Sequence, residues 1–571
     1  MLKKGTIIII TVYILFMFML YQLLMLGMLW TDALPRNLEG ENQNFTSDGQ
    51  ILPTGTDYLI VDDNTESIVA RNVAEWCALY KSGVQKLNAL PDVKNEYSSV
   101  STVFVTTSNI ETVCPTETLK KVLQDGIEII FCISPTISEG NAELLKLLGI
   151  RQYGAPYIQR GMDVLEGMLL GGMFRSEKIS VNTRKIFIDG TAKVFACGYN
   201  KEIRNEENVP LIWRTYYGGT AVYVINSDLM LKKSGMGFLS GLISVALDTY
   251  IYPIVNAKVT VLNNYPMLTS EYDASFNRIY NRGVQNFTRD VIWSDLLSGL
   301  NSLELSFTCY ATAGFNASTL GNYAINNDTL SFFSKEFYKH KCEFAVGNPF
   351  YDTPQDKTHV EMVVSALHNR LSKYTIHSAL TKIPGDFSIP GISVTSVPGL
   401  FDAAEKSVSF SYINKTAVNL PVTVEGTEID DKEILETRLM ATAMGYISYG
   451  VDYGPVYTND SGDDLYRRFN RDFGDSMYAI MFPFKNIEAQ TATGAANRMR
   501  AFLNTDVEVS QNGRDIKIKT NNDGVSYLML RSKYGVASME NVEIASLESR
   551  ATILKVFGRN ASITLSEGEA R

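Results

Sequence analysis

Short apolar runs alternate with helix-like patterns along most of this chain, beginning at about residue 57. Residues 57–61 read as a strand, residues 70–87 have helical spacing, and strand-like runs return at residues 102–107 and 127–134. Strands and helices that alternate at this spacing predict a parallel sheet with helices on both faces. The chain is therefore predicted to be an α/β protein.

The chain is too long for one hydrophobic core, because single cores stop growing at roughly 250–300 residues. It has 571 residues, of which 45% are hydrophobic, so two large domains and a small third one can each bury a core. Near the C-terminus the pattern changes to period two, with a hairpin signal at Asn512 and Gly513. The predicted segments are a cytoplasmic tip and membrane anchor at 1–30, a linker at 31–56, an α/β sandwich at 57–255, a second strand-and-helix domain at 256–496, and a small β-sandwich at 497–571.

An uncharged apolar run occupies residues 6–30, after Lys3 and Lys4 and before Asp32. As a helix rising about 1.5 Å per residue, this run is long enough to cross a hydrocarbon core of roughly 30 Å. The two lysines place the N-terminus in the cytoplasm and the rest of the chain outside. The alternative is a cleaved signal peptide, but the run exceeds the usual apolar region of about 7–15 residues and no A-x-A site follows. We therefore expect a single-pass protein of the cell membrane whose bulk lies outside the cytoplasm.

The charge balance of the chain excludes some partners. The formal net charge is −10 and the isoelectric point is about 5.2, which argues against binding to nucleic acid. A cationic ligand, such as a partly deacetylated amino-sugar polymer, is compatible with this charge.

The six cysteines match neither a zinc motif nor a disulfide framework. Cys77 and Cys132 lie in apolar contexts, where each is expected to be a small buried hydrophobic residue. Cys309 and Cys342 lie on or beside successive predicted strands. They are the one pair to test for a disulfide in an exported chain.

The first domain resembles the sandwich of flavodoxins and glutamine amidotransferases in its order of strands and helices. An amidotransferase needs a cysteine on a tight G-x-C-x-G turn and a histidine as its base. Cys132 lies in IIFCISP without flanking glycines, and no histidine precedes His340. Asp62 and Asp63 follow the first strand, where they would either line a groove for sugars or be solvated. We therefore expect no amidotransferase chemistry in this domain.

The most informative strand of the second domain is AKVTVLNNYPM, residues 257–267. Its apolar run predicts a buried strand, and the polar residues at its carboxyl end would face the mouth of the fold. Other strands of this domain also end in amide, phenol or carboxylate side chains, which suit stacking on sugar rings and hydrogen bonds to sugar hydroxyls. The candidate substrate-binding residues are Asn263, Asn264, Tyr265, Asn348, Tyr351, Asp352, Tyr449 and Asp452, with Tyr453 beside them.

This domain resembles the irregular (β/α) barrel of the polysaccharide deacetylases of carbohydrate esterase family 4. That family has two aspartates at the end of the first strand, one as base and one as metal ligand, whereas this chain has Asn263 and Asn264. The family's second motif, G-N-H-x-x-S-H, corresponds to residues 347–353 (GNPFYDT), and its late catalytic strand to residues 447–450. Neither segment contains a histidine. An amide cannot take a proton at neutral pH, so the resemblance implies the fold without a metal, another cofactor or the usual catalytic residues.

The order of anchor, amidotransferase-like sandwich, deacetylase-like barrel and terminal β-module resembles a bacterial family known as domain of unknown function 2194. The chain is also similar to proteins that modify the Pel exopolysaccharide. The resemblance implies a role outside the cell at a polysaccharide synthase, with a glycosyltransferase and a multi-spanning exporter as partners.

Three hypotheses follow for the function. The first is a pseudoenzyme that binds or scaffolds an exopolysaccharide or cell-envelope glycan through a degenerate deacetylase-like barrel. The second is an active deacetylase or glycoside hydrolase that uses other residues, such as a carboxylate pair formed by Asp352 and Asp452. The third is a structural subunit of an envelope complex without a sugar site.

Overall fold

The fold comes from a computed structural model, which describes most of the chain. The described residues are 12–19, 45–92, 100–138, 140–201, 208–347, 354–370, 374–380, 396–400, 409–459, 463–548 and 550–569. Residues 12–19 form a helical segment with exposed side chains. Among the described helices, none combines the length and the apolar character that crossing a membrane requires. The rest of the predicted anchor, and the linker as far as residue 44, lie outside the described residues.

The first large domain is built on a nine-stranded sheet in the order β2-β1-β3-β4-β9-β8-β7-β5-β6. Neighbouring strands from β2 to β9 in this order are parallel, and those from β9 to β6 are antiparallel. The predicted parallel sheet is therefore correct for only one half of this domain. The strands are β1 (Thr54–Val61), β2 (Ser82–Leu87), β3 (Thr102–Val105), β4 (Glu128–Phe131), β5 (Ile150–Val164), β6 (Phe174–Ile188), β7 (Lys193–Gly198), β8 (Pro210–Tyr217) and β9 (Thr220–Ile225).

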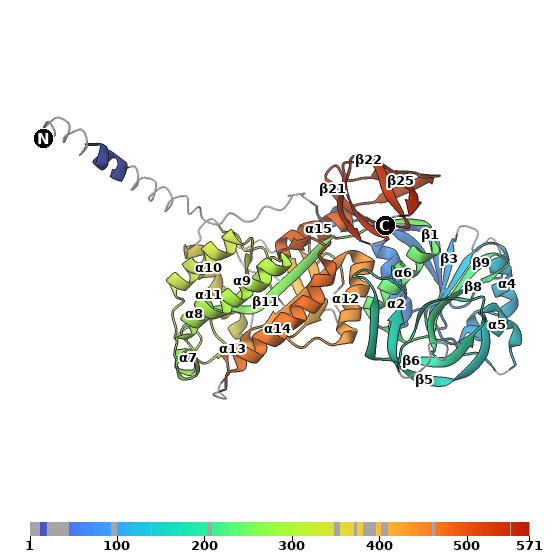
Figure 1. Cartoon of the computed structure of the whole chain (residues 1–571), viewed down its shortest axis with the longest axis horizontal. Helices are drawn as coiled ribbons and strands as arrows, with labels where there is room; N and C mark the ends of the chain where they lie inside the picture. The colour runs from blue at the N-terminus through green and yellow to red at the C-terminus, as the bar shows by residue number, and fades with distance from the viewer. Residues whose placement is uncertain are drawn as a thin grey trace.

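Helices cover both faces of this sheet, as predicted (Figure 1). Helices α2 (Ile68–Leu79) and α6 (Met236–Ala246) pack on one face, and α4 (Thr116–Gln124) and α5 (Ala142–Leu147) pack on the other. The helix predicted at residues 70–87 is too long, because α2 ends at Leu79 and residues 82–87 form the edge strand β2. The backbone reverses at Lys81, whose φ of 60° is incompatible with a continuing right-handed helix.

The second large domain contains a parallel sheet in the order β13-β12-β11-β17-β16, with β18 paired to the start of β11. Every residue of β11 is buried, as the apolar sequence of this strand predicts. The strands are β11 (Ala257–Met267), β12 (Phe307–Thr312), β13 (Glu343–Val346), β16 (Val424–Glu425), β17 (Tyr446–Asp452) and β18 (Ala489–Gln490).

The predicted irregular (β/α) barrel is not confirmed. The described strands of this sheet form an open sheet, and β14 (Ser396–Leu400) pairs with β15 (Val418–Val422) in a separate two-stranded sheet. The helices of the domain are α7 (Asp273–Tyr280), α8 (Val284–Phe287), α9 (Trp293–Leu303), α10 (Asn327–Lys339), α11 (Pro354–Arg370), α12 (Asp431–Met444), α13 (Gly454–Tyr457), α14 (Leu465–Met481) and α15 (Ala492–Asn504).

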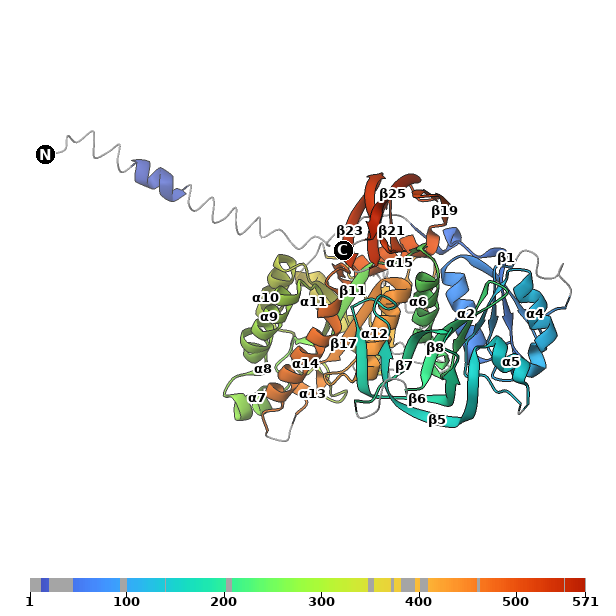
Figure 2. The same cartoon turned by 45° about the vertical axis from the view of Figure 1, so that its right-hand side comes forward.

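Two four-stranded antiparallel sheets form the C-terminal module, drawn in red above α15 and between the larger domains (Figures 1 and 2). Their orders are β10-β21-β24-β23 and β19-β20-β25-β22, and one apolar cluster joins them. The turn at Asn512 and Gly513 connects β19 to β20, as predicted. Strand β10 lies just before β11 in sequence, so the module is completed by a strand from the junction of the large domains. The strands are β10 (Thr249–Pro253), β19 (Val507–Asn512), β20 (Asp515–Thr520), β21 (Val525–Ser532), β22 (Tyr534–Glu540), β23 (Val542–Glu548), β24 (Ala551–Phe557) and β25 (Asn560–Glu569).

A loop of the first domain is held by both other parts of the chain. The Arg438 guanidinium of α12 donates to the carbonyl oxygens of Gly171 at 2.6 Å and Gly172 at 2.8 Å. The Glu548 carboxylate of β23 accepts from the backbone N–H groups of the same two glycines at 2.7 and 3.1 Å. Arg531 of β21, which is 2% exposed, donates to the carbonyls of Gly167 and Met168. The three parts therefore pack as one unit around this loop.

All six cysteines are free thiols, including Cys309 and Cys342. The pair proposed for a disulfide test is therefore unlinked in this structure. Cys77 and Cys132 are buried, as expected from their apolar contexts. Burial raises the pKa of both of these thiols far above the ordinary range, which leaves them protonated.

Candidate functional site

Polar side chains gather where the parallel strands of the second domain end. Asn263 and Asn264 lie near the carboxyl end of β11, and Asp452 is the last residue of β17. Asn263 is directly opposite Asp452 in the β11–β17 pairing and opposite Tyr310 in the β11–β12 pairing. Ligands of open α/β sheets bind at this edge, so the strand ends are the candidate functional site.

Asn264 and Asp452 form a direct hydrogen-bonded pair. The Asn264 side-chain amide donates to the Asp452 carboxylate Oδ1 at 2.7 Å, and the Gly454 backbone N–H donates to the same oxygen at 2.7 Å. Asn264 has a φ of 55°, a left-handed conformation that asparagine tolerates better than most residues. Its own N–H donates to Asn263 Oδ1 at 2.9 Å. The local backbone therefore directs the side-chain amide nitrogen of Asn264, a hydrogen-bond donor, toward the Asp452 carboxylate.

One acceptor in this pair has no partner among the described residues. The carbonyl oxygen of the Asn264 side chain, Oδ1, is buried and accepts no hydrogen bond there. Asn264 is 4% exposed, whereas Asp452 is half-buried. The pair therefore combines a half-buried carboxylate, which a ligand hydroxyl can approach, with a buried amide oxygen that lacks a donor among these residues.

Two half-buried aromatic residues lie beside this pair, and the sequence patterns did not identify them. A Cβ on Gly454 would be 3.2 Å from the Phe315 ring and 3.4 Å from Asn264 Nδ2, so Phe315 is adjacent to the pair. The ring of Tyr272 packs on Phe315 with centroids 6.0 Å apart. The Glu271 carboxylate accepts from the Phe315 backbone N–H at 3.0 Å and so fixes the loop that carries this ring.

The tyrosines predicted to stack on sugars are part of the core. Tyr265, Tyr449 and Tyr453 are each 0% exposed. Tyr453 packs on Tyr265 and Phe469, and the Tyr449 hydroxyl donates to the Gly426 carbonyl oxygen at 2.7 Å. Burial also raises the phenol pKa of all three. None of these rings offers a free face to a ligand in this structure, because neighbouring aromatic side chains pack on them.

Three other candidate residues, Asn348, Tyr351 and Asp352, lie outside the described residues. Their part in the site, and the carboxylate pair of Asp352 with Asp452, stay predictions. The structure thus brings together Asn263, Asn264 and Asp452 from the predicted set.

No group of three or more His, Cys, Asp or Glu side chains with metal-binding spacing occurs among the described residues. His359 of α11, which is 0% exposed, lies at the end of β12. Its Nε2 accepts from the Ala313 backbone N–H at 3.0 Å and lies 3.2 Å from Thr312 Oγ1. His359 therefore fixes the end of β12, and its burial lowers its pKa to about 4.

The buried His359 makes the fold sensitive to acid. Its folded-state pKa of about 4 is below that of an unfolded chain, about 6.5, so the unfolded state takes up a proton first. The free energy of unfolding is expected to fall by about 3 kcal/mol as the pH drops from about 6.5 to about 4. Urea denaturation across this range measures the effect. His359→Gln keeps an acceptor for Ala313 but does not titrate, so an unchanged pH profile in this variant would rule out His359 as the source.

The strand ends of the first domain are occupied by structural contacts. The buried Asp62 carboxylate accepts from Asn64 N–H at 2.8 Å, Ser67 Oγ at 2.7 Å and Thr106 Oγ1 at 2.5 Å, which holds the start of α2. Asp63 accepts from Asn109 Nδ2 at 2.7 Å, and this bond lowers its pKa. The hydrogen bonds to these neighbouring residues therefore explain why both carboxylates are present at these strand ends.

Comparison with known proteins finds one matching family model and one structure with a similar fold. Residues 92–346 match the family model described as "Uncharacterised protein conserved in bacteria (DUF2194)", which confirms the expected resemblance over these residues. No curated protein matches the sequence. Agd3, described as a novel carbohydrate deacetylase, has a similar structure with a TM-score of 0.54 and 8% identity. The alignment covers 92% of this chain and 100% of that chain, so the likeness extends over all three parts of the described fold.

Two further structures match only part of the chain. A putative ThuA-like protein from Bacteroides uniformis has 9% identity and a TM-score of 0.26, and covers 37% of this chain and 96% of its own. The exo-β-1,4-mannosidase Op5Man5 from Opitutaceae bacterium strain TAV5 has 15% identity and a TM-score of 0.22, and covers 31% of this chain and 32% of its own.

Proposed function

We propose that this protein binds a carbohydrate polymer at the strand ends of β11 and β17 and does not carry out metal-dependent deacetylation there. The observation that carries the proposal is the hydrogen bond from the Asn264 amide to Asp452. Zinc is held in proteins by thiolate, imidazole or carboxylate ligands, and the Asn264 amide nitrogen, which donates to Asp452, is none of these. A single carboxylate with a neutral amide partner can accept hydrogen bonds from sugar hydroxyls.

The neighbouring aromatic residues support the same ligand class. Half-buried rings beside a few fixed polar groups are typical of sites that bind sugar rings, because the ring covers the apolar face while polar atoms orient the hydroxyls. Phe315 and Tyr272 supply the rings, and Asp452 with Asn264 supplies the polar atoms. The fold likeness to a protein described as a carbohydrate deacetylase points to the same substrate class.

The cellular setting of the proposal comes from the sequence. The apolar run at residues 6–30 with its preceding lysines favours a membrane-anchored protein whose large domains lie outside the cytoplasm. There the protein would hold a nascent exopolysaccharide or envelope glycan, in contact with a glycosyltransferase and an exporter. Co-purification of such partners from membranes would test this part separately.

Titration calorimetry with tetramers of N-acetylglucosamine and of glucosamine tests the binding site. Asp452→Ala is expected to weaken binding at least about tenfold, because a hydrogen bond to a charged group is worth about 1.5–3 kcal/mol. Asp475→Ala, which removes an exposed carboxylate on α14, is the matched control and is expected to bind like the native chain. Equal affinity of native chain and Asp452→Ala would contradict the proposal.

The alternative, an active enzyme, predicts a different observation. An acetyl-amino-sugar oligomer incubated with the purified protein should then release acetate, and a chelator should stop the release if a metal is involved. We expect no chelator-sensitive release and no stoichiometric zinc in the purified protein.

A further inference from the structure

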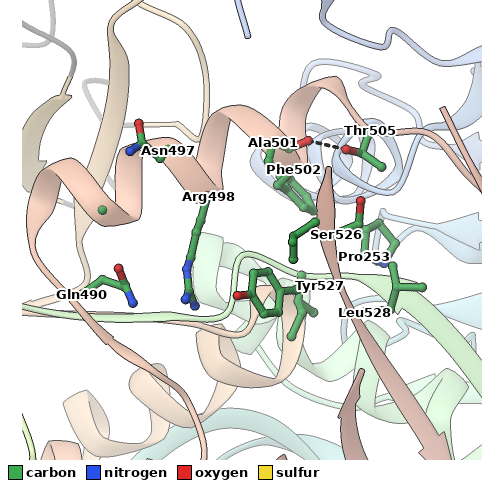
Figure 3. Close-up of a pocket in the computed structure, with 13 residues that line it drawn as sticks. Pro253, Gln490, Asn497, Arg498, Ala501, Phe502, Thr505, Ser526, Tyr527 and Leu528 are labelled. Atoms are coloured by element: carbon green, nitrogen blue, oxygen red, sulfur yellow. Dashed lines mark hydrogen bonds between the residues drawn. The ribbon is translucent and has the colours of Figure 1, made fainter. Parts of the chain in front are cut away.

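A cavity of about 280 Å³ lies between α15 and the C-terminal module (Figure 3). Its walls come from α15, from strands β18 and β21, and from the junction that follows β10. The residues that line it are Pro253, Ile254, Gln490, Gly494, Asn497, Arg498, Ala501, Phe502, Thr505, Val525, Ser526, Tyr527 and Leu528. Small-molecule sites have volumes of about 300–1,000 Å³ and often lie where domains meet, so this cavity suits a small ligand.

The cavity is separate from the strand-end site. Gln490 of β18 is paired with Val259 near the start of β11, whereas Asn264 is close to the other end of the same strand. Five residues of extended strand correspond to about 17 Å. A ligand in the cavity therefore does not touch Asp452 or Asn264.

Among the described residues that line the cavity, none brings an unpaired charge to its polar end. The Arg498 guanidinium donates to the Asn256 carbonyl oxygen, pairs with the Glu488 carboxylate, and lies 4.5 Å from the centroid of the Tyr527 ring. The cation is thus fixed and neutralised before any ligand binds. A ligand that carries its own carboxylate would have to displace Glu488.

The Gln490 amide faces this end of the cavity and lies close to Gly494. A Cβ at position 494 would lie 2.4 Å from Gln490 Oε1, so Gly494 leaves room for the amide. Among the described residues, no side-chain hydrogen bond involves this amide. Figure 3 shows Gln490, Arg498 and Tyr527 directed toward one another beneath α15, with Phe502 and Pro253 farther along the cavity.

The rest of the lining is mostly apolar, with Asn497, Thr505 and Ser526 as neutral polar residues. Pro253, Ile254, Phe502, Val525 and Leu528 form its apolar part, so a ligand needs one apolar face as well as hydrogen-bonding groups at its other end. Combined with the neutral polar end, this excludes a strongly charged ligand as the best fit and favours an uncharged ring with hydroxyl or acetamido groups.

We infer that this cavity is a second carbohydrate subsite, which takes one uncharged sugar unit, such as an N-acetylated amino sugar, and so holds a polymer at a distance from the strand ends. The inference rests on the proposed function for its ligand class. The C-terminal module then has a defined task, because β21 closes one wall of the subsite while β10 ties the module to the second domain.

The test measures binding of N-acetylglucosamine tetramer, glucosamine tetramer and oligogalacturonate to the full chain and to single variants. Ala501→Phe fills the cavity, and Gln490→Ala removes the free amide. Both are expected to weaken binding of the acetylated tetramer at least fivefold. Ser510→Ala, on the exposed strand β19 of the same module, is the control and should bind like the native chain. Thermal unfolding shows whether each variant folds. If Ala501→Phe does not fold, the binding measured for Gln490→Ala alone decides whether the cavity takes the sugar.

The outcomes separate this inference from the proposed function. Weaker binding by the two cavity variants supports the inference, even if Asp452→Ala binds normally and the strand-end proposal fails. Normal binding by both cavity variants together with weak binding by Asp452→Ala overturns the inference and leaves the strand-end proposal intact. Binding of oligogalacturonate alone at the cavity overturns the uncharged ligand class. If the native chain binds none of the three probes, both are overturned.

Discussion

Replacing Asn264 with aspartate is expected to lower the free energy of unfolding at pH 7 by about 3 kcal/mol. The native amide donates to Asp452 Oδ1 at 2.7 Å, and a carboxylate at the same place would bring two negative charges into contact. The new carboxyl group would therefore have a raised pKa in the folded protein. A raised folded-state pKa means that stability is lost as the pH rises from the unfolded value of about 3.9 through the folded value. The deficit of Asn264→Asp should accordingly disappear as the pH is lowered toward about 4.

A double-variant cycle isolates the pair. Asn264→Asp combined with Asp452→Asn exchanges donor and acceptor, so it should recover most of the lost stability at pH 7. Asn264→Gly accepts the positive φ but adds no charge, so its deficit should not depend on pH. Urea denaturation at several pH values measures the native chain, both single variants of the cycle (Asn264→Asp and Asp452→Asn), the double variant and Asn264→Gly. Zinc bound by the native chain, with Asn264 in place, would contradict the proposed function, whereas zinc bound only by Asn264→Asp would agree with a site that lacks one ligand.

Gly237→Ala is expected to lower the free energy of unfolding by about 3 kcal/mol or more, because it forces two helices apart. Gly237 lies in α6 of the first domain, against α12 of the second. A Cβ there would be 2.2 Å from the Leu439 carbonyl oxygen and 2.5 Å from Leu439 Cα. Both atoms belong to backbone, so no side-chain rotation relieves the overlap. The two large domains would have to separate locally along this contact.

Gly474→Ala is the matched control for this prediction. Gly474 is also inside a helix, α14, but a Cβ at this position meets no atom within 4 Å. The substitution should therefore stabilise the protein by up to about 1 kcal/mol through the higher helix propensity of alanine. If the two variants lose or gain stability alike, the α6–α12 contact does not hold the domains together. Denaturant unfolding followed by circular dichroism measures both.

The sequence patterns predicted elements best where local chemistry and burial agree. The run at residues 257–267 is the buried strand β11, and the Asn512–Gly513 turn is the hairpin between β19 and β20. The helix predicted at residues 70–87 extends beyond α2, because the second half of this run is polar and carries no strong strand signal. Residues 82–87 form a strand because they pair with β1, and such pairing depends on segments that are distant in the sequence.

The candidate site was partly predictable for the same reason. Asn263 and Asn264 lie near the carboxyl end of β11 and Asp452 ends β17, and parallel strands end at one edge, so their meeting follows from topology. Phe315 and Glu271 lie in loops after strand ends, where no periodic pattern marks them. Tyr265, Tyr449 and Tyr453 are predicted to stack on sugar rings, but α14 and the neighbouring rings enclose them.

By itself, the sequence determined that the chain alternates strands and helices, that β11 is buried, and that this strand carries the amides of Asn263 and Asn264 near its carboxyl end. These properties follow from residue type and local spacing. Only the tertiary structure decided that half of the first sheet is antiparallel, that the described strands of the second domain form an open sheet, and that Asn264 donates to Asp452. Those outcomes depend on which distant segments pack together, and the free energy of such packing cannot be derived from the residues of one segment alone.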